Sequence, residues 1–236
     1  MEPLLHPRTD DAIMRCHTDL ERVTRNGFAL SKIPIERRTL EVCLAAVKDE
    51  ESIIVDVPKN LLTLEFYLSA VRLNGLVLEY VPEEFITLEL CLEALKQTLE
   101  SFYYISDEFK TLEMCLEVVK EDALFLGVVP WELQTYEMCL AAVKDTACVF
   151  NKVFEGYMTR ELCLVAIKKN GWNLRHVPRK SRTEEMCLAA VTEDGWVLSS
   201  VPRYLKTVEV CLAALRQDPT VLEFCPYSPL KLLGVV

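Results

Sequence analysis

Apolar side chains recur in the same order every 24 residues along most of this chain. The phrase Thr-Leu-Glu-Val-Cys-Leu-Ala-Ala-Val begins at Thr39, and it returns in varied form at every later step. Its threonines, separated by 24 residues without insertion or deletion, are Thr39, Thr63, Thr87, Thr111, Thr135, Thr159, Thr183 and Thr207. Self-similarity at this period is typical of a solenoid, in which each repeat buries its apolar face against its neighbours.

The first half of each repeat predicts an α-helix. Counting the threonine as position 1, positions 2, 5, 6 and 9 are mostly apolar, as in Leu88, Cys91, Leu92 and Leu95. This i, i+3, i+4, i+7 spacing predicts one helix with these side chains facing inward. The threonine can cap the first turn, while a glutamate at position 3 and a lysine or arginine at position 10 suit the two ends of the helix dipole. A small residue at position 8, usually alanine, allows neighbouring helices to approach closely.

The second half of each repeat predicts a shorter helical return. In several repeats an Asn-Gly or Asp-Gly pair follows the helix, and we expect the glycine to end it in a left-handed conformation. An apolar pair such as Leu78 and Val81 comes next and is usually followed by proline, which predicts one or two turns of α or 3₁₀ helix. The predicted fold is all-α: an α-solenoid of about nine 24-residue repeats, each with one α-helix and a short α or 3₁₀ helical return.

We predict a single elongated domain with four parts. These are an N-terminal segment over 1–14, a degenerate N-terminal capping repeat over 15–38, eight helical repeats over 39–230 and a C-terminal tail over 231–236. In the capping repeat Asp19 replaces the cysteine and Arg22 replaces the small residue, as expected at the polar end of a solenoid. We expect the apolar LKLLGVV at the other end to cover the last repeat or to dock into another chain.

The repeats resemble a known family. The segments VRLNGLVLEYVPEEFITLELCLEAL and VTEDGWVLSSVPRYLKTVEVCLAAL share the cysteine-leucine phrase, the glycine and the Val-Pro pair in register. This pattern resembles the bacterial repeats called domain of unknown function 4116, from about Asn26 onward. The resemblance implies a bacterial helical-repeat protein, with some family members from host-associated species, and it implies no common activity.

Composition and charge limit where the protein is expected to be located and which classes of partner it is expected to bind. The chain has 236 residues, a hydrophobic content of 51% and a net charge of −10. It contains no apolar run near the roughly 20 residues that span a bilayer, and its amino terminus lacks the pattern of a Sec-type signal, so we expect no membrane insertion. The negative charge argues against nucleic acid as a partner. We expect a monomer in the reducing cytoplasm, with delivery to a host cell by a signal-less secretion route as an alternative.

The cysteines are the most conspicuous candidates for chemistry. Seven occupy position 5 of the repeat: Cys43, Cys91, Cys115, Cys139, Cys163, Cys187 and Cys211. Equivalent positions on neighbouring helices lie about 8 to 10 Å apart, too far for a shared zinc ion or a disulfide. We therefore expect these thiols to be small buried apolar groups, with no metal and no cofactor. His176 is the one histidine that could approach a cysteine, either Cys148 or Cys163.

Positions that vary between repeats are the best candidates for partner binding, because the constant positions serve the stacking. The two residues after Val-Pro change from acidic to basic along the chain, and two tryptophans share one repeat position near several arginines. Charge asymmetry can orient a partner, and Trp and Arg are enriched at binding hot spots. The predicted partner-binding residues are Glu83, Glu84, Asp107, Glu108, Trp131, Glu132, Trp172, Arg175, Arg179, Lys180, Trp196, Arg203 and Tyr204.

These observations predict a non-enzymatic scaffold that binds another protein or a peptide along a curved face. Its biological role would be that of a bacterial effector or adaptor. An immunity-type inhibitor of a toxin is an alternative within the same class. An enzyme with a cysteine nucleophile is the alternative from a different class.

Overall fold

A computed structural model describes residues 18–228, and within this range the regular elements are all helical. The predicted N-terminal segment 1–14 and the tail 231–236 lie outside the described residues. The chain divides into two compact units, which we call unit 1, ending at Phe109, and unit 2, beginning at Lys110. No helix in the described range is long and apolar enough to cross a membrane.

Unit 1 begins with a helical segment over 18–25 and continues with alternating α-helices and 3₁₀-helices. Its α-helices are α2 (Leu40–Asp49), α3 (Leu64–Leu73) and α4 (Leu88–Gln97). Its 3₁₀-helices are η1 (Gly27–Lys32), η2 (Ile35–Arg37), η3 (Glu51–Asp56), η4 (Lys59–Leu61), η5 (Gly75–Tyr80), η6 (Glu83–Phe85), η7 (Leu99–Tyr104) and η8 (Asp107–Phe109).

Unit 2 continues the same alternation. Its α-helices are α5 (Leu112–Glu121), α6 (Tyr136–Asp145), α7 (Arg160–Lys169), α8 (Glu184–Glu193) and α9 (Val208–Gln217). Its 3₁₀-helices are η9 (Ala123–Val128), η10 (Ala147–Lys152), η11 (Glu155–Tyr157), η12 (Gly171–His176), η13 (Arg179–Ser181), η14 (Gly195–Ser200), η15 (Arg203–Leu205) and η16 (Pro219–Phe224).

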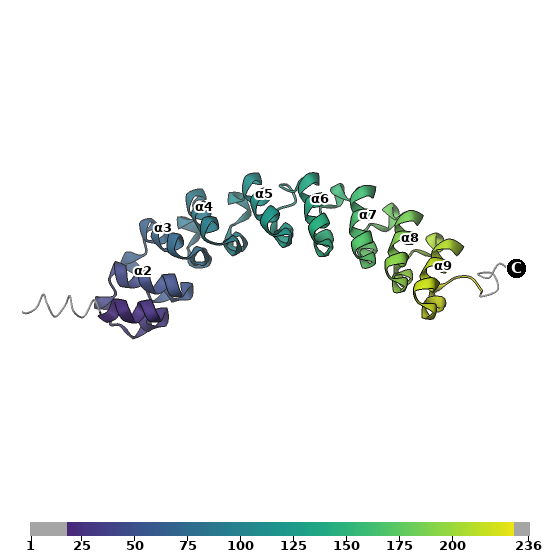
Figure 1. Ribbon diagram of the computed structural model, residues 1–236. Helices are drawn as coiled ribbons and strands as arrows, with labels where there is room; N and C mark the ends of the chain where they lie inside the picture. The colour runs from purple at the N-terminus through teal and green to yellow at the C-terminus, as the bar shows by residue number, and fades with distance from the viewer. Residues whose placement is uncertain (1–17, 229–236) are drawn as a thin grey trace, which may run out of the picture. The chain divides into compact units, whose positions relative to one another are not determined.

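Each repeat from α2 to α9 is one ten-residue α-helix followed by a six-residue 3₁₀-helix and, in most repeats, a three-residue 3₁₀-helix. Within each unit the α-helices pack side by side in one layer and the six-residue 3₁₀-helices pack side by side in a second layer (Figure 1). This arrangement confirms the predicted all-α helical-repeat fold and the helical return. The predicted single elongated domain stays a prediction.

The repeated threonine sets the start of every α-helix from α2 to α9. Its hydroxyl oxygen accepts a hydrogen bond from the backbone amide three residues later, as when Thr87 accepts from Leu90 at 3.2 Å. This bond satisfies one of the amides that a first helical turn leaves unpaired. The prediction of a threonine cap is confirmed in all eight of these helices.

The buried face of the α-helices differs from the predicted one. Positions 4, 5 and 8 are buried, as in Leu90, Cys91 and Ala94, each with no exposed surface. The expectation that position 2 faces inward is wrong for most helices, since Leu88, for example, is 44% exposed. Position 6 is half-buried in six of the eight helices and exposed in two, including Leu92 at 41%. The reason is that the 3₁₀ layer covers the side of the α-helix centred on positions 4, 5 and 8, which leaves positions 2 and 6 at its margin.

The recurring glycine serves close packing, and the expectation of a left-handed helix end is wrong. The α-helix ends one residue earlier at an extended residue, such as Asn74 with φ of −149°, whose side chain caps the following 3₁₀-helix. Gly75 is the first residue of η5 and lies against the next α-helix. A Cβ atom there would lie 2.6 Å from the carbonyl oxygen of Ala94. Only glycine permits this approach without moving a backbone segment.

The glycine also sets the spacing between neighbouring repeats. The same contact recurs between Gly171 and Ala190 and between Gly195 and Ala214, with Cβ distances of 2.5 and 2.7 Å. The helices that follow such glycines pack closely on their predecessors, as α8 does on α7 and α9 on α8. Where alanine takes the glycine position, at Ala123 and Ala147, the pairs α5 with α6 and α6 with α7 pack less closely.

In five repeats a long polar side chain at position 24 ties that repeat to the next. The guanidinium of Arg182 donates to the carbonyl oxygens of Val177 at 2.9 Å, Arg175 at 3.1 Å and, in the next repeat, Ser200 at 2.8 Å. The same reach across 18 residues is made by Arg38, Lys110, Gln134 and Lys206. These side chains satisfy carbonyl groups at the ends of the 3₁₀-helices, so they belong to the fold.

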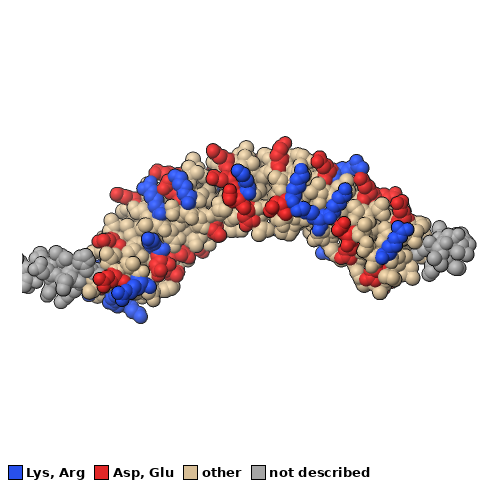
Figure 2. Space-filling view, in the orientation of Figure 1, with Lys and Arg blue, Asp and Glu red and all other residues tan. Residues whose placement is uncertain are grey.

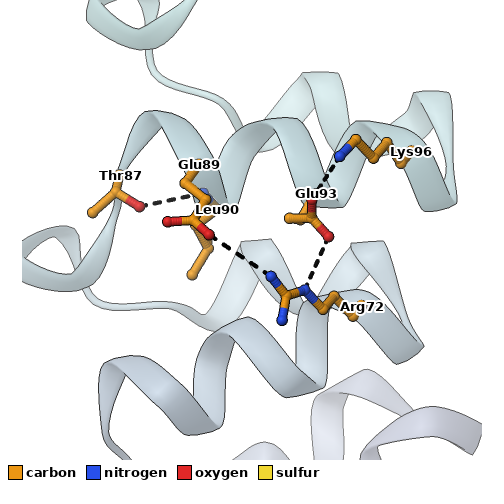
Figure 3. A network of polar contacts seen from close by, with 6 residues as sticks. All are labelled: Arg72, Thr87, Glu89, Leu90, Glu93 and Lys96. Atoms are coloured by element: carbon orange, nitrogen blue, oxygen red, sulfur yellow. Dashed lines mark hydrogen bonds and ion pairs between the residues drawn. The ribbon is translucent and has the colours of Figure 1, made fainter.

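Charged residues on the α-helices add a second set of ties in unit 1. Arg72 of α3 donates to Glu93 of α4 at 3.0 Å and lies 3.7 Å from Glu89, while Lys96 contacts Glu93 at 2.6 Å (Figure 3). Hydrogen bonds from Lys96 and Arg72 lower the pKa of Glu93 below its ordinary value. Because all four side chains touch solvent, these pairs contribute modestly to stability.

The first repeat contains a buried ion pair. Asp19, at the position of the repeated cysteine, is 1% exposed and lies 2.5 Å from Arg37 and 3.8 Å from Arg22. The residue expected to be a polar cap is therefore enclosed and neutralised by two arginines, as a buried carboxylate requires.

We predict that Gly171→Ala destabilises the protein because its new Cβ would meet the backbone of Ala190. The free energy of unfolding should fall by about 1–3 kcal/mol, measured by urea denaturation followed by circular dichroism. Gly127→Ala is the matched control, since a Cβ there would meet only the side chain of Lys152 at 3.5 Å. Equal stability of the two variants would contradict the proposed role of the glycine.

Candidate interaction surface

The repeated cysteines lie inside the core. All seven at position 5 are free and buried, with no exposed surface. Burial raises the pKa of five of these thiols from the ordinary 9.0 to about 11, namely Cys43, Cys91, Cys139, Cys163 and Cys187. A thiol with so high a pKa is protonated at neutral pH and is a poor nucleophile. These residues fill space between the two helical layers.

His176 is exposed in η12, and burial and the nearby Arg175 lower its pKa below the ordinary value. No hydrogen bond joins it to Cys148 or Cys163 in the part of the chain that the structure describes. Within residues 18–228 no group of three or more His, Cys, Asp or Glu side chains is placed to hold a metal ion.

The predicted acidic residues of unit 1 lie on the three-residue 3₁₀-helices. Glu83 and Glu84 belong to η6, Asp107 and Glu108 belong to η8, and all four are exposed. Each pair follows the bend that ends the preceding six-residue 3₁₀-helix, so the backbone directs these side chains to the edge of the repeat. Their exposure is compatible with the predicted contact with a partner.

In unit 2 the corresponding edge carries exposed aromatic rings. Trp131 is 59% exposed and stacks on Phe154, with ring centroids 5.3 Å apart and an interplanar angle of 27°. Phe154 is itself 39% exposed, and Tyr157 packs edge-on against it at 5.6 Å. Large aromatic surfaces left open to solvent are uncommon on a protein that has no use for them.

The same edge becomes basic toward the end of unit 2. Lys180 of η13 lies 3.9 Å from Glu155 of η11. The hydroxyl of Tyr204 in η15 donates to the carbonyl oxygen of Arg179 at 3.1 Å. These contacts show that successive repeats place their variable residues side by side. We call the resulting surface the edge row; it consists of Trp131, Glu132, Phe154, Glu155, Arg179, Lys180, Arg203 and Tyr204.

A polar hollow opens at the basic end of the edge row. It has a volume of about 580 Å³ and is lined in part by Arg179, Ser199, Ser200, Arg203, Tyr204 and Glu223. Neither Arg179 nor Arg203 takes part in an ion pair within the described residues. Acidic and basic side chains are interspersed over the face of unit 2 drawn in Figure 2. The two arginines therefore add local positive charge that an acidic ligand could pair with.

The predicted tryptophan pair has a structural role. The indole N–H of Trp172 donates to Asp194 at 2.7 Å, and that of Trp196 donates to Asp218 at 2.8 Å. Both aspartates cap the 3₁₀-helix of the next repeat, so each tryptophan ties one repeat to its neighbour. Arg175 lies over the Trp172 ring at 4.6 Å. Trp196 is still 43% exposed, so part of its ring remains available for contact.

Sequence reasoning missed Phe154 and Tyr157. Phe154 stands at position 20, which proline occupies in most repeats, and this departure from the pattern was the available signal. Gln134 holds it in place, because its side-chain oxygen accepts from the Phe154 amide at 2.8 Å and its nitrogen donates to Lys152. The aromatic stack arises only when two successive repeats are brought together.

The fold and this surface define a helical-repeat protein. The family model described as "Domain of unknown function (DUF4116)" matches the chain twice, over residues 63–110 and 183–230. These two matches confirm the resemblance of the repeats to that family. Neither a curated protein nor a solved structure matches the chain.

We predict that, among the cysteines of residues 18–228, thiol labelling of the native protein modifies Cys148 first and Cys225 next, because the former is exposed and the latter partly so. The buried thiols at position 5 should react only on the time scale of unfolding. Mass spectrometry of peptides after timed alkylation measures both rates. A rapidly labelled thiol among the position 5 cysteines would instead favour the cysteine enzyme.

We also predict a steep loss of stability above about pH 9. The unfolded chain releases its thiol protons near the ordinary pKa of 9.0, whereas the folded chain keeps those of Cys187 and its equivalents up to about 11. The folded state thus binds more protons in this window, and the free energy of unfolding falls by about 1.4 kcal/mol per pH unit for each thiol.

Urea denaturation between about pH 7 and pH 10.5 measures this slope, and Cys187→Ala is the matched variant. The free energy of unfolding of this variant should fall less steeply with pH than that of the parent. The two slopes should differ by the contribution of one thiol, about 1.4 kcal/mol per pH unit. Identical slopes would contradict the assignment of this loss to the buried cysteines.

Proposed function

We propose that this protein is a non-enzymatic scaffold that binds another protein through the edge row of unit 2. The ligand is a segment with an apolar side chain that packs on Trp131 and Phe154 and with carboxylates that pair with Arg179 and Arg203. Within the family resemblance, the biological role is that of a bacterial effector or adaptor.

The observation that supports this proposal best is the adjacency of an open aromatic stack and free arginines on one edge. Trp and Arg dominate the energetics of protein interfaces, because a large ring and a guanidinium both gain much from contact with a partner. Here Trp131 is 59% exposed, and Arg179 and Arg203 form no ion pair among residues 18–228. Trp131 stacks on Phe154 of the next repeat, yet its ring remains open enough to contact a partner.

The placement of the cysteines supports binding over catalysis. The seven repeated thiols are buried, and for Cys91 and Cys163 the pKa is raised to about 11. The exposed Cys148 lies 3.3 Å from the hydroxyl of Thr146, which is no general base. A nucleophile needs a base within hydrogen-bond reach, and no described contact gives these thiols one.

The double variant Arg179→Glu and Arg203→Glu tests the proposal. The ligand is first isolated by affinity capture on the full chain and identified by mass spectrometry, and its affinity is then measured by titration. Reversing both charges should weaken binding by about 100-fold or more, because two attractive contacts become repulsive. Trp131→Ala should weaken it about tenfold or more through loss of the aromatic anchor.

Lys168→Glu with Arg216→Glu is the matched control. It makes the same change in net charge at the C-terminal ends of α7 and α9, away from the edge row. This control should bind within about twofold of the parent, and all variants should keep the helical circular dichroism. Equal binding by the Arg179 and Arg203 double variant would refute the proposed surface.

A further inference from the structure

The α-helical layer of unit 2 has a groove between α5 and α6, apart from the edge row. The groove there has a volume of about 430 Å³. Its lining residues are Leu116, Val119, Lys120 and Glu121 from α5, with Glu137, Met138, Ala141, Ala142 and Asp145 from α6. No residue of the edge row contributes to it.

The groove has a cause in the sequence of the repeat. Ala123 occupies the position at which glycine elsewhere brings a 3₁₀-helix against the carbonyl of the next α-helix. At the glycine positions a Cβ would lie 2.5 to 2.7 Å from that carbonyl oxygen, as between Gly171 and Ala190. Ala123 carries a real Cβ, so α6 cannot approach as closely. The two helices pack less closely than α7 and α8, and the space between them remains open.

The floor of the groove is apolar. Leu116 occupies position 6, on the margin that the 3₁₀ layer leaves uncovered, and it is 44% exposed. Val119, Met138 and Ala142 are nearly buried beneath it, while Ala141 is exposed. An apolar concavity of this size is at the lower end of the range for ligand pockets, about 300–1,000 Å³. It can take one or two bulky apolar side chains.

The rim of the groove is mainly acidic. Glu121, Glu137 and Asp145 are exposed, and none of their carboxylates takes part in an ion pair within the described residues. Two positive charges lie near these three negative charges: Lys120 lines the groove, and Lys169 of α7 donates to the backbone carbonyl oxygen of Asp145 at 3.0 Å. An acidic ligand would be repelled from this rim.

We propose that the groove between α5 and α6 binds a basic peptide segment of a partner protein. The segment places a bulky apolar side chain on Leu116 and Met138 and flanking lysines or arginines against Glu121, Glu137 and Asp145. Charge complementarity selects this occupant, because only a cation beside the apolar anchor would neutralise the three free carboxylates. This site is independent of the edge row, whose ligand carries the opposite charge.

Selection of displayed peptides on the full chain tests the proposal. Random peptides of about ten residues are selected on the parent and then compared for binding to Ala141→Trp and Ala213→Trp. The new indole at position 141 would fill the groove, whereas position 213 is the same repeat position in α9, where Gly195 brings the neighbouring helices together.

The expected result is a group of peptides with a bulky apolar residue flanked by lysine or arginine. These peptides should lose at least about tenfold in affinity on Ala141→Trp and bind Ala213→Trp like the parent. They should also bind the Arg179→Glu and Arg203→Glu double variant as well as the parent, which separates this site from the edge row. The proposal is overturned if no selected peptide depends on Ala141, or if those that do are acidic.

Ala123→Gly tests the cause of the groove without touching its lining. Removal of the Cβ should let α6 move toward α5, so the same basic peptides should bind at least about threefold more weakly while the circular dichroism is unchanged. Glu137→Gln with Asp145→Asn should weaken the basic peptides and reduce the salt dependence of binding. Unchanged affinity in both of these variants would also overturn the proposal.

Discussion

The closest packing between repeats occurs where a glycine begins a 3₁₀-helix and lies against the α-helix of the next repeat, as it does in four of the repeats. Gly75 and Gly195 meet the carbonyl oxygens of Ala94 and Ala214 at distances that leave no room for a Cβ. A small residue is therefore required on both sides of the contact. The spacing between repeats follows from this pair of positions, because a packed interior does not stretch to absorb an extra methyl group.

The side chains therefore fall into two groups. One group packs or hydrogen-bonds within and between repeats, and the other makes no contact that the fold needs. The threonine caps, the position 5 thiols and the position 24 side chains such as Arg182 and Lys206 are used within and between repeats. Trp172 belongs to the same group, since its indole binds the capping Asp194. Charge or aromatic character alone therefore does not mark a binding residue in this fold. Arg203 stands out because it takes part in no ion pair among residues 18–228, and Trp131 stands out because it stays 59% exposed although it stacks on Phe154.

The two proposed surfaces of unit 2 arise from departures from the repeat. The aromatic stack of the edge row forms where Phe154 replaces the usual proline, and the groove forms where Ala123 stands at the position that holds glycine in four other repeats. The change at Phe154 adds aromatic surface at the edge of the repeats, and the change at Ala123 leaves space between two α-helices. One surface is aromatic and basic, whereas the other is apolar and acidic, so a single scaffold can bind two ligands of opposite charge.

The sequence by itself determined the period, the helical content, the threonine caps and the burial of Cys91 and its equivalents, because these depend on interactions within one repeat or on strict repetition. It did not determine which margin of the α-helix stays open. Leu88 and Leu92 fit an apolar stripe, and only the position of the 3₁₀ layer decides that they are exposed. The function of the glycine and the edge row were also decided by tertiary structure. Both depend on how closely one repeat approaches the next, a distance set by packing between segments about 20 residues apart.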